Sequence, residues 1–315
     1  MSTLATLAVN IIGNTRGLQS AMTEAQSTMR ASAEKIKTAG TTLSLAVTAP
    51  VVGAGTAVLK MAGDFQASMN RVEALTGLVG DTTGTFEKLK DQAKELGATT
   101  AFSASEAADA MGFLAMAGFK ADEIMTAMPA TLQLAASASV DLGTAADIAS
   151  NILSGFGFEA AELGRVNDIL VKTMTSSNVD LRMLGESMKY AAPVAAALGF
   201  EFEEISAAIG LMGNAGIQGS MAGTALRGAL ARLAAPTKEV SKTLADLGVN
   251  VFDTSGNLLP LAGIMGQLEG AGASATDVMT IFGLEAGPAM QALLSQGSGA
   301  LLEFTEELRN SGGTA

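Results

Sequence analysis

Apolar residues recur at helical spacing from the start of the chain. Over residues 18–36 they share one face of a helix, and Gly40 follows as a stop signal. A second stripe over residues 61–77 predicts another amphipathic helix, followed by a loop rich in Gly, Thr and Asp. The two stripes consist of Leu18, Met22, Ala25, Met29, Ala33 and Ile36, and of Phe65, Met69, Val72 and Leu75.

Residues 38–59, between these two stripes, contain no charged side chain. As one helix they would extend about 33 Å, which is enough for the apolar core of a bilayer. The proline, glycines and hydroxyl side chains of this stretch offset much of the gain from Leu and Val, so insertion would be marginal. Pro50 would kink the helix or start a second one after Thr48 and Ala49. Ala49, Gly53 and Ala57 form a small-residue stripe that lets backbones approach closely.

The middle of the chain contains a repeat that begins at Phe102, Val140 and Val179, so successive starts are 38 and 39 residues apart. Each unit has a Ser or Asp at its start, an Ala-rich helix, a Gly-Phe pair and an acidic residue that opens a return helix. Gly permits the left-handed conformation that ends a helix, Phe packs back over the last turn, and the acid complements the next helix dipole. Each unit is therefore predicted to be a helical hairpin, and three stacked hairpins would bury an Ala-rich seam. The turns are Gly118 and Phe119, Gly157 and Phe158, and Gly199 and Phe200, and the acids are Glu123, Glu162 and Glu204.

The last third of the chain is divided by glycines. Residues 205–226 are uncharged, but five glycines divide them too often for one straight helix, since each costs about 1 kcal/mol relative to Ala in a helix interior. Beyond Pro236 a helix ends at Gly248, and "VNVFDTSGNLLP" over residues 249–260 is the one good strand signal. Short helices follow, with breaks expected at Gly283, Gly287, Gly297 and Gly299.

These patterns predict an all-α fold, an array of Gly-punctuated helical hairpins with at most one short β-hairpin near residues 249–260. We expect three regions. Residues 1–62 hold the amphipathic helix and the uncharged segment, residues 63–248 form the hairpin core, and residues 249–315 hold the short hairpin and C-terminal helices. The final "RNSGGTA" resembles the approach to another helix, so we expect the chain to continue in a longer protein.

Composition narrows the chemistry. The chain has no Cys and no His, which removes thiol nucleophiles, imidazole bases and the usual zinc, copper and haem ligands, so we expect no metal site and no cofactor. Its net charge is -12, with +3 in residues 1–60 and -15 in the remainder. Most of the protein would therefore repel nucleic-acid phosphates, and no nucleic-acid binding is expected.

One catalytic interpretation concerns Glu186. Gly185, Glu186 and Ser187, followed by a Gly-Leu-Met run at 210–212, resemble the order of residues in lytic transglycosylases. Glu186 would act as a general acid there if an apolar pocket raised its pKa. No Gln follows Met212, and with one Tyr and no Trp the aromatic sugar platform is missing. The sequence therefore favours Glu186 as a solvated helical residue, and no catalytic residue is assigned.

Two other acidic or Gly-rich patterns have structural interpretations. The segment 155–160, "GFGFEA", matches the dinucleotide fingerprint G-x-G-x-x-A, but it follows a predicted helix rather than a strand, so turn chemistry explains it. Carboxylate pairs such as Asp122 with Glu123 and Glu203 with Glu204 are interpreted as first-turn charges of the return helices.

Taken in order, several segments resemble the tape measure proteins of tailed bacteriophages and prophages, specifically the TP901-type minor tail family. They are "TTLSLAVTAPVVGAG", "LKDQAKELGATTAFSASEAADAMGFLAMAGF", the two "VDL" repeats, "GTALRGALARLAAPTKEV", "LGVNVFDTSGNLLPL" and "IFGLEAG". The similarity covers roughly residues 38–310. No single motif is chemically diagnostic, but the co-linear series is specific.

The resemblance implies a structural, non-enzymatic role. Several copies of such a protein occupy the lumen of a growing tail tube, set its length during assembly and leave at genome ejection, in some members helping to form a route across the cell envelope. The implied partners are tail tube proteins, tail tip or baseplate proteins, tail assembly chaperones, other copies of the chain and the host inner membrane. The implied locations are the virion tail lumen, the host cytoplasm during assembly and the envelope on ejection.

Within that framework the Gly-Phe turns fold the chain back on itself, so we interpret this region as a packed or convertible block rather than as the ruler. A peptidoglycan-degrading module and a generic helical adaptor remain alternatives. Residues 38–59 are either a buried helix pair under the array or a segment that packs in the tail and enters a membrane after release. The interaction residues predicted for them are Leu43, Val47, Ala49, Pro50, Gly53 and Ala57.

Overall fold

The fold is a stack of α-helices. The computed structural model describes the backbone of residues 43–315 and the side chains of residues 60–315. These residues form thirteen α-helices and one short 3-10 helix, which confirms the all-α prediction. Where one short β-hairpin was expected, an isolated antiparallel bridge joins Phe252 to Leu258, and no named strand occurs among the described residues. The chain divides into two compact units, Met1–Gly63 and Asp64–Ala315.

The helices follow one another with short connections. They are α3 (Leu43–Thr76), α4 (Thr85–Thr99), α5 (Ala104–Met116), α6 (Ala121–Ala138), α7 (Leu142–Phe156), η1 (Ala160–Glu162), α8 (Leu163–Ser176), α9 (Leu181–Ala197), α10 (Phe202–Asn214), α11 (Ser220–Ala234), α12 (Lys238–Asp246), α13 (Leu261–Gly270), α14 (Ala275–Gln296) and α15 (Ser298–Arg309).

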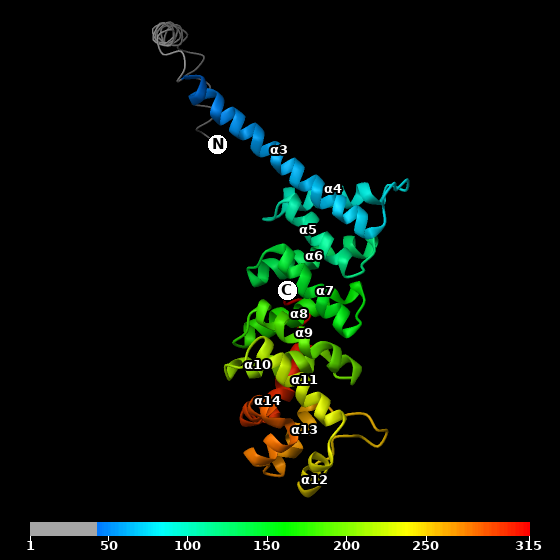
Figure 1. Ribbon diagram of the computed structural model, residues 1–315, viewed down its shortest axis with the longest axis vertical. Coiled ribbons are helices and arrows are strands. Elements are labelled where there is room, and N and C mark those ends of the chain that lie inside the picture. The colour runs from blue at the N-terminus through cyan, green and yellow to red at the C-terminus, as the bar shows by residue number, and fades with distance from the viewer. Residues whose placement is uncertain (1–42) are drawn as a thin grey trace, which may run out of the picture. The chain divides into compact units, whose positions relative to one another are not determined.

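The second unit consists of stacked hairpins arranged in two rows. Helices α5, α7, α9, α11 and α14 pack successively against one another in one row, and α6, α8, α10 and α15 form the second. Figure 1 shows the layers following chain order, from α4 in cyan through α9 in green to α12 in yellow. The three predicted repeats correspond to the pairs α5 with α6, α7 with α8, and α9 with α10.

Each repeat begins with the expected side-chain cap. Ser103 accepts a hydrogen bond from the backbone amide of Glu106, and Asp141 and Asp180 do the same for Thr144 and Met183. A cap of this kind satisfies one of the amides that a helix leaves unpaired at its N-terminus. The helix starts are therefore specified locally by the sequence.

Each first helix of a repeat ends at its Gly-Phe pair in the same geometry. Gly118, Gly157 and Gly199 have φ values of 94°, 72° and 80°, a left-handed conformation that favours glycine. The amide of the following Phe donates to a carbonyl five residues earlier, at 3.1 Å, 2.9 Å and 3.0 Å for Phe119, Phe158 and Phe200. This is the Schellman motif, which closes the helix and turns the chain back toward the array.

Glycines inside the helices serve close packing instead. A Cβ on Gly223 of α11 would collide with the backbone of Ser187 in α9, and the hydroxyl of Ser187 donates to the Gly219 carbonyl at 2.8 Å. The glycine-divided stretch 205–226 does split into α10 and α11, as expected, with the break at residues 215–219. Some of its glycines lie at the break between the helices, and others lie inside a helix where they allow neighbouring backbones to touch.

Helix α3 differs from the prediction. Its backbone is helical at every residue from Leu43 to Thr76, so no second helix starts after Thr48 and Ala49. The separate amphipathic helix expected from residue 61 is the second half of α3, and its Met69 and Val72 are fully buried against the array. The uncharged stretch and the amphipathic stripe both favour helix, and no stop signal separates them. Of the helices with described side chains, none is long and apolar enough to cross a membrane.

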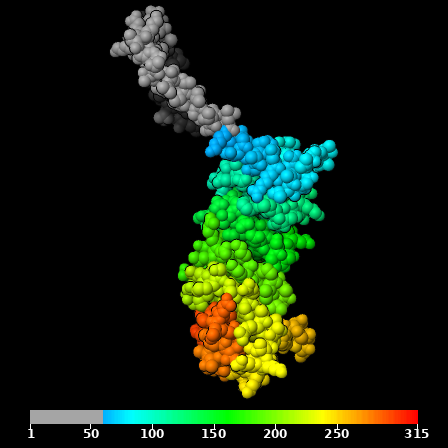
Figure 2. All heavy atoms as spheres, in the orientation of Figure 1, coloured from blue at the N-terminus to red at the C-terminus, as the bar shows by residue number. Residues whose placement is uncertain are grey.

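The C-terminal helices fold back over the array. Helix α14 packs on α11 and α12, and α15 lies against α10, α13 and α8. In Figure 2 their orange and red atoms lie beside the yellow atoms of α11 and α12. The chain then ends against α8, where the Asp168 carboxylate accepts from the amides of Gly313 at 2.9 Å and Ala315 at 2.8 Å. The last residues are thereby held at the middle of the second row.

Candidate functional site

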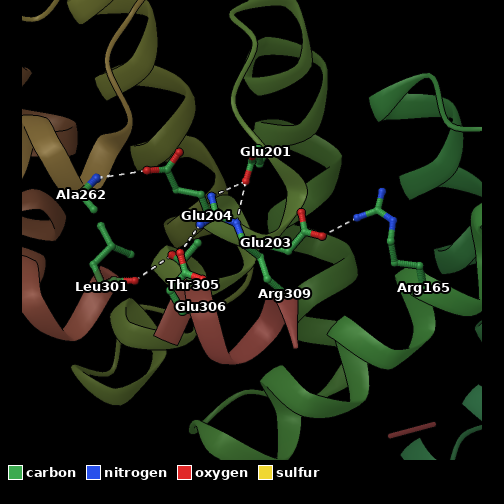
Figure 3. A network of polar contacts seen from close by, with 9 residues as sticks. All are labelled: Arg165, Glu201, Glu203, Glu204, Ala262, Leu301, Thr305, Glu306 and Arg309. Carbon is green, nitrogen blue, oxygen red and sulfur yellow. Dashed lines mark hydrogen bonds and ion pairs between the residues drawn. The ribbon is translucent and has the colours of Figure 1, made fainter. Parts of the chain in front are cut away.

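The third turn, residues 199–204, is the junction between the repeats and the C-terminal helices. Three glutamates occur within four residues here, and each bonds to a different element (Figure 3). Glu201 pairs with Arg309 of α15, Glu203 pairs with Arg165 of α8, and Glu204 bonds to the start of α13. We call this set of contacts the third-turn network.

Glu204 shows how this turn departs from the other two. In the first turn, the equivalent Glu123 accepts from the backbone amide of Lys120 at 2.6 Å, and in the second, Glu162 accepts from Glu159 at 3.2 Å. Glu204 instead turns away from its own helix and accepts from the amide of Ala262 at 3.1 Å. The same kind of N-terminal acid thus caps its own helix twice and another helix once.

Burial gives Glu204 a distinct electrostatic state. Only 5% of the residue is exposed. Burial raises the pKa of its carboxyl group because the charged form loses its hydration, while the amides of Ala262 and Leu261 oppose that shift. The carboxylate lies at the N-terminus of α13, where the helix dipole favours negative charge.

Glu203 connects the third turn to the second. Its Oε1 atom lies 2.5 Å from Nη1 of Arg165, and only 12% of the Glu203 side chain is exposed. Arg165 also pairs with Glu162 at 3.1 Å and lies over the ring of Phe158, with 4.8 Å from Cζ to the ring centroid. A single guanidinium therefore holds the acids of two turns and one aromatic face.

Arg309 of α15 closes the other side of the network. Its Nη2 and Nε atoms lie 2.5 Å and 3.0 Å from Oε2 of Glu201, and it also pairs with Glu306 of its own helix. The hydrogen bonds that Arg309 donates to Glu201 raise the pKa of Arg309 further, so this side chain stays charged. Nearby, the Thr305 hydroxyl donates to the Leu301 carbonyl at 2.7 Å within α15.

Three phenylalanines fill the space beneath these ion pairs. Phe156 stacks on Phe158 with ring centroids 5.3 Å apart, and Phe202 meets both rings edge-on at 5.2 Å and 6.1 Å. Phe202 is 1% exposed. A hollow of about 510 Å³ opens beside the cluster, between the second and third turns. Its lining comprises Phe156, Phe158, Arg165, Ala196, Gly199, Phe200, Glu201, Phe202, Glu203 and Arg309.

This arrangement joins helices rather than presenting reactive groups. Each of the three glutamates has a guanidinium or backbone-amide partner, so their oxygens are committed to holding α8, α13 and α15 in place. Among the residues with described side chains, no cluster of three or more acidic side chains is placed to hold a metal ion. The network holds the C-terminal helices against the hairpin array.

The predicted turn residues are only partly brought together. Phe158, Gly199 and Phe200 line the same hollow, whereas Gly118 and Phe119 do not. The predicted interaction residues Leu43, Val47, Ala49, Pro50, Gly53 and Ala57 lie outside the side chains that the structure describes. The first-turn interpretation of Glu203 and Glu204 is right in position, since both lie in the first turn of α10, but it missed that both are buried.

Glu186 does not occupy the environment that a general acid needs. Its carboxylate pairs with Lys189 at 3.0 Å, and about half of the side chain is exposed. It lies at the rim of a hollow of about 470 Å³ whose other charged residues include Asp141, Asp147 and Arg182. This half-exposed, ion-paired position is not the apolar pocket that the general-acid interpretation requires.

Sequence patterns missed Arg165, Arg309 and Phe202. One usable signal exists for Phe202, because the aligned positions of the first two repeats hold Ala121 and Ala160. A large aromatic residue at a position where the first two repeats have Ala indicates an extra packing contact. The two arginines lie 38 and 108 residues from their partners, so no local pattern could identify them.

Comparison with known proteins gives a consistent result. Residues 90–282 match the family model described as phage-related minor tail protein. The chain is 42% identical over 282 residues to the tape measure protein of Pneumococcus phage Dp-1, an alignment that covers 88% of this chain and 24% of the relative. It is 33% identical over 269 residues to the probable tape measure protein of Escherichia phage P2, covering 82% of this chain and 33% of the relative.

A more distant relative is the probable tape measure protein of Clostridium phage phiCD119, at 24% identity over 78% of this chain and 27% of the relative. The chain thus spans about a quarter to a third of the length of these curated relatives. No solved structure is significantly similar to it.

Proposed function

The chain belongs to the family of phage-related minor tail proteins, and on that premise we propose that it is the folded helical block of a tape measure protein. The whole protein would set tail length inside the tail tube and leave through it at genome ejection. The observation that carries the proposal is the alignment at 42% identity over 88% of this chain with a relative named tape measure protein. Its partners would be tail tube, tail tip or baseplate proteins, assembly chaperones and further copies.

The hairpin array supports a specific division of labour within such a protein. A length ruler needs an extended chain, and a helix extends about 1.5 Å per residue. Here the Gly-Phe turns reverse the chain three times within residues 102–214, which keeps the block short for its number of residues. We therefore assign length measurement to other parts of the protein and a packed, structural role to this block.

Duplication of one hairpin in a phage that carries this gene tests that assignment. The second repeat, residues 140–178, would be copied in frame after residue 178, and tail length would be measured by electron microscopy. A folded block predicts tails of wild-type length. An extended ruler predicts tails longer by about 58 Å, since the copy adds 39 residues at 1.5 Å each. Tails lengthened by that amount would overturn the assignment.

A matched control separates folding from insertion itself. The same 39-residue copy with Gly157→Ala and Phe158→Ala lacks the turn, so it favours a continuous helix. If only extended segments of the protein contribute to tail length, the copy without the turn should lengthen the tail and the native copy should not. Equal lengths for both copies and wild type would place the whole region outside length measurement.

Residues 38–59 carry the membrane part of the proposal. A small-residue stripe without charges is suited to close packing in the tail and to lipid after release. A peptide of residues 38–62 would be tested for leakage of anionic and neutral liposomes, with Gly53→Leu as the comparison peptide because it fills the stripe. Absence of binding and leakage for both peptides would remove this part of the proposal and leave the tail role intact.

A further inference from the structure

Leu284 is the most exposed large apolar residue in the described part of the chain, at 85% exposed. It lies in the middle of α14, directly after Gly283. Gly283 has φ 81° and ψ 170°, a backbone conformation essentially restricted to glycine, and the helix is kinked at this point. Leu284 is therefore exposed at a break in the helix rather than on an ordinary helix surface.

Arg232 of α11 holds the backbone at this break. Its Nη2 atom donates to the Thr280 carbonyl at 3.2 Å. The same guanidinium fills the space beside Gly283, with Cζ 3.2 Å from the position of an ideal Cβ there. Because these contacts fix the chain just before Leu284, its side chain is presented from an ordered backbone, which reduces the entropy that binding would cost.

The hollow beside the third-turn network has the chemistry to receive such a side chain. Its apolar lining consists of Phe156, Phe158, Phe200, Phe202 and Ala196. Its volume is about 510 Å³. An apolar cavity of about 150 Å³ is already large enough to bind benzene. The hollow therefore has room for a leucine side chain together with the residue beside it.

The rim of the hollow carries two guanidinium groups with further donor capacity. Arg309 donates three hydrogen bonds to two glutamates, and Arg165 donates two. A guanidinium has five N–H donors, and both side chains are partly exposed, at 40% and 41%. The paired glutamates neutralise the arginines, so the rim offers hydrogen bonds at short range rather than a long-range positive field.

Leu284 is followed by an acid that suits this rim. Glu285 is exposed, and no ion pair with another described side chain involves it. A carboxylate accepts strong, charge-assisted hydrogen bonds from guanidinium N–H groups. Leu284 and Glu285 thus place an apolar side chain beside a carboxylate, and the hollow places phenylalanine rings beside guanidiniums. The two surfaces of the same chain are complementary in both kinds of contact.

From this complementarity we propose that Leu284 of one copy of the chain inserts into the third-turn hollow of a second copy. Glu285 of the inserting copy then accepts hydrogen bonds from the guanidiniums at the rim, Arg165 and Arg309. An interface of this size is weak in solution and strengthens where copies are held at high local concentration. The contact is a property of the chain itself. Its use between copies inside a tail rests on the proposed function.

The fluorescence of a single tryptophan tests this contact in the 315-residue chain without a phage. The chain has no native Trp, so Leu284→Trp makes the inserting residue the sole tryptophan of a probe chain. The probe chain is titrated with an acceptor chain that carries Leu284→Asp, which keeps the hollow but cannot insert, because an aspartate would lose its hydration there. We expect a saturable blue shift of the emission as the indole leaves water for the phenylalanine rings.

Three further variants separate insertion from non-specific apolar association. Leu302→Trp, at another exposed leucine in α15, is the matched probe and should show no shift with the same acceptor. An acceptor that also carries Ala196→Phe has a filled hollow and should bind the probe at least about tenfold more weakly, with unchanged helical circular dichroism. Glu285→Lys in the probe chain should weaken binding by up to about fivefold, and less at high salt.

Hydrogen exchange locates the contact without altering the hollow. In the acceptor chain, the amides of residues 199–203 should gain protection when the probe chain is added, and those of the first turn, residues 118–120, should not. Equal protection at both turns, or at neither, overturns the proposal. A blue shift of the same size with the matched Leu302→Trp probe also overturns it. Each of these results leaves the tail-length experiment on the duplicated hairpin to be judged separately.

Discussion

The second and third hairpins begin their return helices with the same pattern but use it differently. Both have Gly, Phe and Glu at the turn and a second Glu three residues later. In the second hairpin that later residue, Glu162, caps its own helix, and Ala160 occupies the place between them. In the third, Glu204 is buried against the start of α13, and Phe202 fills the position of Ala160.

The difference teaches that a repeat can become a junction through one enlarged side chain and one redirected carboxylate. The turn geometry itself is unchanged, since Phe158 and Phe200 make the same closing hydrogen bond. What changes is the partner, because Glu204 bonds to α13 and Glu201 to α15, whereas Glu162 caps its own helix.

The largest effect is expected for Phe202→Ala. This side chain is buried and meets the rings of Phe156 and Phe158 edge-on, so its removal leaves a cavity and loses two aromatic contacts. The free energy of unfolding should fall by about 3–5 kcal/mol in urea titration. Phe119→Ala at the half-buried first turn is the comparison and should cost about 1 kcal/mol. Equal losses would mean that the third turn is not a junction.

Glu204→Ala should follow in size. It leaves the Ala262 amide without its acceptor in a buried site, at a cost of about 2 kcal/mol in the free energy of unfolding. Glu123→Ala removes a comparable hydrogen bond from the exposed first turn and should cost about 0.5 kcal/mol. Hydrogen exchange at the first turn of α13 is the local measurement. Unchanged protection there in Glu204→Ala would contradict the contact.

A smaller and pH-dependent effect is expected for Glu204→Gln, in which the amide imitates the protonated acid. Because burial raises the pKa of Glu204 in the folded state, protonation is favoured by folding. The wild type should therefore match the Gln variant at pH values below the ordinary glutamate pKa and lose stability relative to it as the pH rises through the raised value. Unfolding curves from pH 4 to pH 8 measure this difference.

Asp141, which caps the second hairpin, should show the opposite pH dependence of stability and serves as an internal control. Hydrogen bonds from the Thr144 side chain and amide lower the pKa of this carboxyl group. Wild type should be more stable than Asp141→Asn at neutral pH and lose that advantage as the pH falls through the lowered value. If the stability difference between wild type and variant changed with pH in the same direction for Glu204→Gln and Asp141→Asn, neither pKa shift would be caused by the contacts of its turn.

The smallest effect is expected for Arg309→Ala. The Arg309 side chain is 40% exposed, so its pairs with Glu201 and Glu306 are screened by solvent. The loss in the free energy of unfolding should stay below about 1 kcal/mol and shrink further in high salt. Urea titrations at low and high sodium chloride measure it. A loss that is large and insensitive to salt would mean that Arg309 packs as well as pairs.

Sequence patterns predicted the parts of this fold that are encoded locally. The hairpins, their Asp and Ser caps and the break at Gly283 follow from residues within a few positions of each feature. The third-turn network could not be predicted in the same way. Glu203 and Glu204 have the same local sequence signal as a simple helix cap, and only the packing of α13 and α15 decides where their carboxylates point.

The error at α3 has a related cause. Pro50 was expected to kink the helix or to start a second one, and the change from an uncharged to an amphipathic stretch suggested a second helix, but a helix can continue through a proline, which removes one backbone hydrogen bond. No glycine with an unusual conformation lies between Lys60 and Met69 to stop it. Stop signals at the turns predicted helix ends well, whereas composition changes did not.

The contact between Asp168 and the last residues determines how this block would respond to mechanical force. Because the carboxylate holds the amides of Gly313 and Ala315 at α8, a pull on the C-terminal end loads the middle of the stack first. Once α15 has detached, we expect the stacked hairpins to unfold in sequence, because most of their contacts are with the adjacent hairpins. Each hairpin of 38 or 39 residues would release about 130 Å of contour length. Under tension the block would therefore lengthen in discrete steps, one for each hairpin that unfolds.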